Sequence, residues 1–355
     1  MTKTKKNIIA FSIILQYILV RWISNYPELV ESYYTFGIYQ KISTILRYGL
    51  GWIPFSIGDL LYIFFGIYII RWLFLNKKRI STDTKHLILD VLGFCSLIYF
   101  LFHLFWGLNY YRVPVHKTLQ FSTTYSTKAL EEITLKLINK ANNIHVTITK
   151  NDTLKINIPY SKNKLLKLAN NGYDKLGKIY PQFNQNTTSI KLSLFSLPLT
   201  YMGFSGYLNP FTNEAQIDYL IPKHKYPTTI CHEKAHQLGY AAENEANFIG
   251  CLAAINSDDP YFQYSGYIFA LRHCLIELNK RDQNLYRSYV KYINKGIMKN
   301  YQESLDFWDS YDNFLEPLFK MSYNSFLKAN NQEKGIESYN YAVSLFVTYF
   351  KNKDL

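Results

Sequence analysis

The chain has 355 residues, enough for a membrane region and one further domain with a sizeable core. Its net charge of +13 does not indicate a nucleic-acid partner, because no basic stripe accompanies a known nucleic-acid-binding motif. The positive charge suits anionic membrane lipids instead. The four cysteines form no C-x-x-C pair, so we expect no disulfide framework and interpret each as a small buried hydrophobic residue.

Three apolar stretches predict membrane-spanning helices near residues 8–23, 55–75 and 88–108. The first is short for a span, but no small-residue cleavage site follows it, so we interpret it as an uncleaved anchor rather than a signal peptide. Aromatic residues make up 17% of the chain, as suits a protein with membrane interfaces. Residues 1–111 are therefore predicted to form a transmembrane region.

The distribution of lysine and arginine predicts the orientation of the spans. Basic residues cluster before the first span and between the second and third, at Lys3, Lys5, Lys6, Lys77, Lys78, Arg79 and Lys85. With three spans, both clusters lie on one side, and the positive-inside rule makes that side cytoplasmic. Residues 112–355 then form an extracytoplasmic domain of a multi-pass membrane protein. With only two spans, this domain would face inward.

Three ionisable residues lie in or beside the predicted spans, namely Asp59, Asp90 and His103. Such residues are functional candidates by default. Asp59 lies near Pro54 and Asp90 near the edge of its span, so solvation at the interface is the favoured interpretation for both.

The middle of the chain alternates between helical and strand-like patterns. Apolar spacing predicts helices at residues 127–141 and 163–176, strands at 144–148, 189–195 and 214–220, and almost continuous helix from 227 to 350. Strands followed by helices predict an α+β domain with a mostly helical C-terminal half.

His232, Glu233 and His236 form the motif H-E-x-x-H. On a helix, the two histidines lie four residues apart on one face, where both imidazoles can bind one Zn²⁺ ion. Glu233 lies beside them and can act as a general base toward a water molecule. A coincidental match on a surface helix is the alternative. A cap at Thr228 or Thr229 and a helix end at Gly239 favour the metal site.

A catalytic zinc site needs a third protein ligand, and two carboxylates compete for this role. On an unbroken helix, Glu243 would lie about 10 Å beyond the histidines, so the chain must turn at Gly239 and a second helix must present the ligand. Glu243 is the favoured ligand. Asn247, four residues later, is expected to hydrogen-bond one of the metal ligands without contacting the metal itself. Glu245 remains the alternative.

H-E-x-x-H followed by Glu243-x-x-Ala-Asn247 resembles the gluzincin metallopeptidases, in which E-x-x-A-D carries the third ligand. This resemblance implies the ligand role for Glu243, although gluzincins have a longer insert between the two motifs. The form H-E-x-x-H-x-x-G is similar to metzincins, but Ala242 stands where their third ligand would be.

A second resemblance covers nearly the whole chain. Its motifs are Trp52-Ile-Pro-Phe-Ser56, Gly107-Leu-Asn-Tyr-Tyr-Arg112, Gly206-Tyr-Leu-Asn-Pro-Phe-Thr212 and Glu245-Ala-Asn-Phe248. They resemble a bacterial membrane family known only as a domain of unknown function. That resemblance implies three membrane helices and a zincin-like H-E-x-x-H domain, a metallopeptidase activity, and a location in the bacterial cytoplasmic (inner) membrane.

The predicted function is a membrane-anchored zinc metallopeptidase that hydrolyses peptide or protein substrates, with His232, His236 and Glu243 as ligands and Glu233 as the base.

In zincins the substrate pairs with a sheet edge, and residues 206–220 are either that edge or an ordinary hairpin turning at Asn209-Pro210. Candidates for stabilising the oxyanion are Tyr240, Tyr264, Tyr267, Arg272 and His273.

The alternative is a non-catalytic membrane receptor or assembly factor that retains the fold. An intramembrane protease is disfavoured, because only short apolar runs flank the motif.

Overall fold

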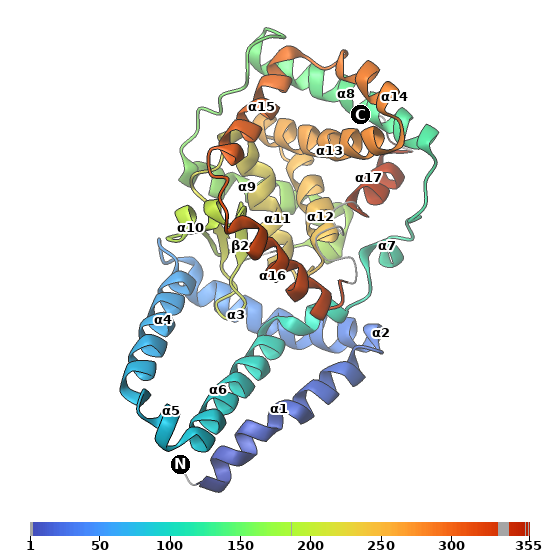
Figure 1. The fold of residues 1–355 in the computed structure, drawn as a ribbon. Coiled ribbons are helices and arrows are strands. Elements are labelled where there is room, and N and C mark those ends of the chain that lie inside the picture. The colour runs from blue at the N-terminus through green and yellow to red at the C-terminus, as the bar shows by residue number, and fades with distance from the viewer. Residues whose placement is uncertain (1–2, 186, 333–340, 352, 354) are drawn as a thin grey trace.

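Three apolar helices occupy the first third of the protein: α1 (Lys3–Ile23), α4 (Ile57–Asn76) and α6 (Thr84–Phe105). The computed structural model describes residues 3–185, 187–332, 341–351, 353 and 355. Each helix is long and apolar enough to cross a membrane, which confirms the three predicted apolar helices with ends shifted by a few residues. They extend from one side of a larger, mostly helical C-terminal region (Figure 1).

The two predicted interfacial carboxylates are paired with protein groups rather than simply solvated. At the end of the spans far from the C-terminal region, Asp90 forms ion pairs with Lys6 (2.8 Å) and Arg79 (3.0 Å). Asp59, in the first turn of α4, is fully buried and accepts hydrogen bonds from Ser193 Oγ (2.9 Å) and from Tyr207. The solvation prediction for Asp59 is wrong because the end of α4 packs into the C-terminal region.

The segment between the first two spans is helical and joins the spans to the C-terminal region. It consists of α2 (Pro27–Leu29), the π-helix η1 (Val30–Tyr39) and α3 (Gln40–Gly51). Side chains from this segment and from the residues that follow α6 share a small core with Ala241 of the C-terminal region, and they include Val30, Tyr34, Tyr39, Trp106 and Tyr111. The membrane helices are therefore packed onto the C-terminal region rather than tethered to it.

A small sheet lies where α4 meets the C-terminal region. Its strands β1 (Ile190–Leu192), β2 (Gly206–Leu208) and β3 (Ala215–Ile217) have the order β1-β3-β2, with β1 parallel and β2 antiparallel to β3. The strands predicted at 189–195 and 214–220 are confirmed in shorter form. Residues 206–217 form a hairpin, and its first strand is also an edge of the sheet.

One predicted strand is wrong. Residues 144–148 form the last part of helix α8 (Thr127–Thr149). Ile144 and its neighbours favour a strand locally, but Leu137, Ala141 and Ile144 continue the buried stripe with which α8 packs against α13. Tertiary packing outweighs the local β propensity of this segment.

The remaining predicted helices are confirmed within the described residues, and residues 333–340 of the predicted run from 227 to 350 lie outside them. The confirmed helices are α9 (Lys162–Ile179), α11 (Tyr226–Gln237), α12 (Glu243–Ile255), α13 (Pro260–Arg281), α14 (Gln283–Val290), α15 (Lys295–Asp309), α16 (Glu316–Ala329) and α17 (Ala342–Lys351). Short helices include α5 (Arg79–Thr82), α7 (Val115–Thr118) and α10 (Ser196–Tyr201). Helix α12 is almost entirely buried among α9, α11, α13 and α17 and forms the centre of the core.

The four cysteines are free thiols, and three of them are buried as predicted. Cys95 of α6 is exposed instead. The apolar run around Cys95 predicts that it is buried. Helix α6 is apolar on all sides, however, and most of its side chains are not buried inside the protein.

Candidate metal centre

The H-E-x-x-H motif lies on α11, whose ends differ in how well the sequence predicts them. The helix ends at Gln237, and Gly239 follows with a φ of +88°, so the predicted turn at this glycine is confirmed. The predicted cap is wrong: α11 begins at Tyr226, and Thr228 lies within its first turn, where its hydroxyl donates to the carbonyl of Lys225 (3.1 Å).

Residues near the membrane helices hold the C-terminal end of α11. Arg47 of α3 donates a 2.8 Å hydrogen bond to the carbonyl of Gln237, and the Tyr39 hydroxyl donates to the same oxygen at 3.0 Å. Arg112 donates to the carbonyl of Gly239 (3.2 Å). These bonds satisfy carbonyls that a helix end would otherwise leave unpaired.

A close crossing with α12 fixes the second half of the site. A Cβ atom on Gly250 would lie 2.6 Å from the backbone nitrogen of His232, so only glycine lets the two helices approach this closely. The crossing places Glu243, the first residue of α12, opposite the two histidines. A second helix after the turn, as the sequence predicted, therefore presents this carboxylate.

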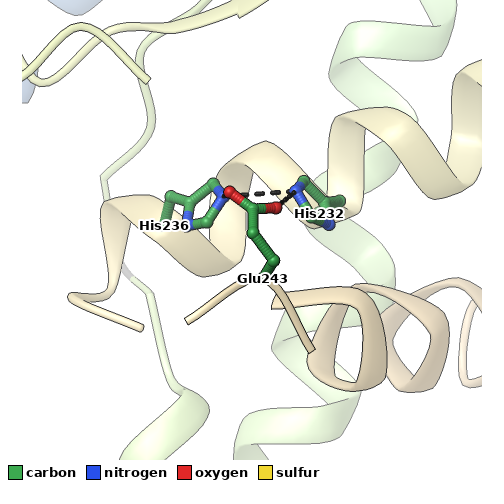
Figure 2. A group of neighbouring side chains, drawn as sticks. All are labelled: His232, His236 and Glu243. Carbon is green, nitrogen blue, oxygen red and sulfur yellow. Dashed lines mark hydrogen bonds and ion pairs between the residues drawn. The ribbon is translucent and has the colours of Figure 1, made fainter. Parts of the chain in front are cut away.

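His232, His236 and Glu243 converge on one point (Figure 2). The Nε2 atoms of the two histidines are 3.2 Å apart, and they lie 3.3 Å and 3.7 Å from the Glu243 carboxylate oxygens. Glu245 does not join this group. Its carboxylate accepts a hydrogen bond from the backbone nitrogen of Val115 (2.7 Å). Of the two acids that the sequence left open, the structure brings only Glu243 to the histidines.

The donor set fits a divalent cation. His236 Nδ1 lies 2.7 Å from the carbonyl of Tyr240, so this nitrogen carries the proton and Nε2 presents a lone pair to the centre of the group. Tetrahedral ligands with bonds of about 2.1 Å lie about 3.4 Å apart, close to the separations observed here. Two imidazole nitrogens and a carboxylate are the ligand types that zinc prefers.

Burial and neighbouring charge perturb all the acids and bases of the site. Burial opposes ionisation of Glu243, but the hydrogen bond from His232 and the charge of His236 lower the pKa of Glu243 to about 2. Burial lowers the pKa of His236 to about 4 and raises that of Glu233 to about 8. The Oε2 atom of Glu233 is buried and accepts no hydrogen bond within the described part of the chain. The Glu233 residue also lines the cavity into which the site opens.

Two further side chains support the ligand set. Burial opposes protonation of His232, but its hydrogen bond with Glu243 and the charges of Glu233 and Glu243 raise its pKa, and the buried side chain of Asn247 adds to this effect. Tyr323 of α16 donates a 2.6 Å hydrogen bond to Oε1 of Glu243. The sequence analysis missed Tyr323, because no local pattern marks one tyrosine among 32 as a neighbour of a residue 80 positions away.

The site opens into a cavity of about 1050 Å³. Residues 203–208, which include β2, form one wall, and Tyr323 and α13 form others. Among the candidates for oxyanion stabilisation, Arg272 and His273 line the cavity. Tyr240 and Tyr264 instead belong to the buried core, where the Tyr264 hydroxyl donates to Asn300 (2.8 Å), and Tyr267 is buried against the same core.

Comparison with known proteins places the chain in a family without giving it a function. No curated protein and no solved structure matches it significantly. One family model, DUF3810, described as a protein of unknown function, matches residues 34–347. This match runs from η1, between the first two spans, into α17 and includes the whole candidate metal centre. The chain therefore belongs to the DUF3810 family.

Proposed function

We propose that this protein is a membrane-anchored, zinc-dependent metallopeptidase. The observation that carries the proposal is the convergence of His232, His236 and Glu243 in one cavity with the unpaired Oε2 atom of Glu233. Those three side chains would hold Zn²⁺, and Glu233 would remain outside the ligand set.

The roles of the residues follow from their positions. When bound, zinc supplies a Lewis acid that makes water a stronger nucleophile and polarises the carbonyl group to be attacked. Glu233 takes a proton from the attacking water at its free Oε2 atom and returns it to the leaving amine nitrogen. The contact between His236 Nδ1 and the Tyr240 carbonyl holds this imidazole in the tautomer whose Nε2 binds metal.

The edge strand supports a peptide as the substrate. Ser205 and Asn209 direct their backbone groups toward the β3 side, through bonds with Asp218 and Glu214. Backbone groups alternate in direction along a strand, so Gly206 and Leu208 direct theirs away from the sheet. A Cβ atom on Gly206 would lie 2.8 Å from Oε1 of Glu233, so an extended peptide paired with β2 would pass beside the base.

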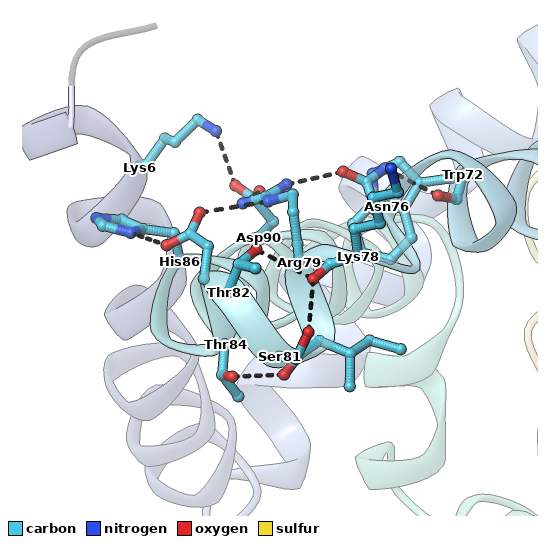
Figure 3. Close-up of polar contacts among 12 residues, drawn as sticks. Lys6, Trp72, Asn76, Lys78, Arg79, Ser81, Thr82, Thr84, His86 and Asp90 are labelled. Atoms are coloured by element: carbon cyan, nitrogen blue, oxygen red, sulfur yellow. Dashed lines mark hydrogen bonds and ion pairs between the residues drawn. The ribbon is translucent and has the colours of Figure 1, made fainter.

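We also propose that the C-terminal region faces the outside of the bacterial cytoplasmic membrane. Lys6, Lys78 and Arg79 gather at the end of the spans that lies away from this region (Figure 3). The positive-inside rule assigns such a cluster to the cytoplasmic side.

The Glu233→Gln variant tests the enzymatic part of the proposal. Purified protein would be assayed for zinc content and for cleavage of a mixed fluorogenic peptide library, with Glu132→Gln on the exposed side of α8 as the matched control. We expect Glu233→Gln to retain zinc and to lose roughly 10²- to 10⁴-fold in cleavage rate, which is the usual contribution of a general base. Cleavage at the wild-type rate would favour a receptor or assembly factor with a structural metal.

A further inference from the structure

The cavity continues past the candidate metal centre into the membrane helices. Tyr62 of α4, with Ile98 and Phe102 of α6, lines its far end. Trp106, which follows α6, connects the two ends, because it also lines the cavity and packs edge-on against His236 with ring centroids 5.9 Å apart. The space beside Glu233 and the space between these two helices are therefore parts of one cavity.

The far end of the cavity lies within the depth that the helices would span. Ile98 comes seven residues before the end of α6, and Tyr62 comes five residues after the start of α4. At 1.5 Å per residue, these side chains arise about 10 Å and about 8 Å below the helix ends. The 22 residues of α6 are close to the length that a hydrocarbon core requires, so both depths fall inside it.

The arrangement of the helices sets α4 and α6 apart beside this end of the cavity. Helix α1 packs along α6. In Figure 1, α4 joins α6 through α5 at the far end of the spans and separates from it toward the C-terminal region. The cavity-lining residues between the two helices are aromatic or aliphatic and offer no charge to a polar ligand.

One cavity connects the residues of α4 and α6 with the base. The rings of Tyr62 on α4 and Tyr207 on β2 stack with centroids 6.3 Å apart, so the edge strand β2 lies beside the first turns of α4. Asp59 accepts a hydrogen bond from Tyr207 and fixes β2 to this helix. One residue before Tyr207, Gly206 lies against Glu233.

We infer that the substrate is a polypeptide anchored in the bilayer by its own apolar segment. This segment enters between α4 and α6, and the chain that leaves the membrane pairs with β2 and is cut beside Glu233, within a few residues of the membrane surface. The inference rests on the proposed function. The backbone groups of β2 favour a polypeptide over a lipid, because they match an extended peptide chain.

A photocrosslinking experiment tests binding without requiring cleavage. The full-length Glu233→Gln protein is reconstituted into phosphatidylethanolamine and phosphatidylglycerol vesicles with a synthetic peptide. The peptide has an apolar helix of about 20 residues, a polar tail of mixed sequence and a benzophenone near the end of the helix. We expect adducts at Tyr62, Ile98 and Phe102. Adducts confined to outward-facing residues of α4 such as Phe64 and Phe74, or no adducts, would overturn the inference.

The same experiment distinguishes a polypeptide from a lipid. A photoactivatable phospholipid is added in place of the peptide and then together with it. We expect the peptide to suppress any labelling of Ile98 and Phe102 by the lipid. Lipid labelling of these residues that the peptide cannot suppress would replace the polypeptide with a lipid as the ligand.

A cleavage experiment separates the inference from the proposed function. Ile98→Trp should narrow the membrane end of the cavity, whereas Leu97→Trp places the same side chain on an exposed position of α6. We expect Ile98→Trp to reduce cleavage of the anchored peptide about tenfold relative to cleavage of the free tail, whereas Leu97→Trp should produce no such difference.

Cleavage of the free tail alone, without adducts, would refute the inference and leave the peptidase proposal in place. Adducts at the three positions, without cleavage of any peptide, would show that an anchored polypeptide binds there and would refute the peptidase proposal.

Discussion

The hydroxyl of Tyr323 donates a 2.6 Å hydrogen bond to Oε1 of Glu243 and thereby links α16 to the candidate metal centre. The ring of Tyr323 also packs against Phe204, with centroids 5.0 Å apart. Phe326 on the same helix packs against Phe102 and Tyr110, with centroids 6.1 Å away in both cases. Helix α16 is therefore held across the cavity by apolar contacts, while one polar atom reaches the proposed ligand.

Tyr323→Phe should weaken zinc binding while leaving α16 in place. The variant keeps the ring contacts and removes only the hydroxyl that orients the carboxylate, and loss of such a partner typically costs about 10- to 100-fold in metal affinity. Competition with a zinc-chelating dye measures the affinity, with Tyr292→Phe on an exposed residue as control. Unchanged affinity together with slower peptide cleavage would instead show that the hydroxyl acts on the substrate.

Glu243→Gln and Glu245→Gln should differ in their effect on metal affinity. Glu243→Gln removes a charged ligand atom, and we expect at least about a tenfold loss. Glu245→Gln keeps a carbonyl oxygen that can accept from Val115, so its zinc affinity should stay near that of the wild type. Titration of the metal-free proteins with zinc measures both. The reverse order would move the third ligand to Glu245.

Gly239→Ala should disturb the turn that separates the two ligand-bearing helices. Its φ of +88° is unfavourable for alanine, and the new Cβ would lie 2.9 Å from Oδ1 of Asn109. We expect a loss of at least about 1 kcal/mol in the free energy of unfolding. Gly49→Ala is the control, because Gly49 lies in α3 with open space around it, where alanine should stabilise the helix slightly. Denaturation in detergent compares the two, and equal midpoints would contradict this account.

The parts of the site that the sequence predicted are those encoded by short-range spacing. The separation of His232 and His236, the helix end at Gly239 and the return of Glu243 on a second helix all follow from helix geometry over a dozen residues. Glu245 could not be dismissed from sequence, because its bond to Val115 joins segments 130 residues apart.

Long-range contacts decided the features that the sequence did not predict. Residues 144–148 continue a helix because α13 packs against it. Arg47 and Tyr39 hold the end of α11 from a segment that the sequence assigned only to the predicted transmembrane region 1–111. Asp59 is buried because the start of α4 contacts β1 and β2, and no property of the apolar run itself reveals this.

Reporter fusions test the proposed orientation of the membrane helices. A reporter that is active only outside the cytoplasm should function when fused after Leu355 and should be inactive when fused after Lys78, between α4 and α6. A reporter active only in the cytoplasm should show the opposite pattern. The reversed pattern, with Leu355 in the cytoplasm and Lys78 outside, would mean that α1 does not cross the membrane, and cytoplasmic activity at both positions would mean that α6 does not cross it.

The end of the cavity away from the membrane should prefer acidic peptide tails, and this preference should weaken above pH 8. Lys225 and Arg272 both line that end. Burial, together with the nearby positive charge of Arg272 and against the opposing effect of Asp218, lowers the pKa of Lys225 to about 8. Lys225 is therefore largely protonated at pH 7 and loses its charge as the pH rises to 9.

Competition between glutamate-rich and glutamine-rich tail peptides, both free in solution, measures this preference at pH 7 and pH 9. We expect the wild-type preference for the acidic peptide to fall over this interval. Lys225→Met should show a smaller preference at pH 7 that changes little with pH, because only Arg272 remains. Lys291→Met, at an exposed position outside the cavity, should behave as the wild type. A preference that is equal at both pH values in the wild type would show that Lys225 does not contact the bound tail.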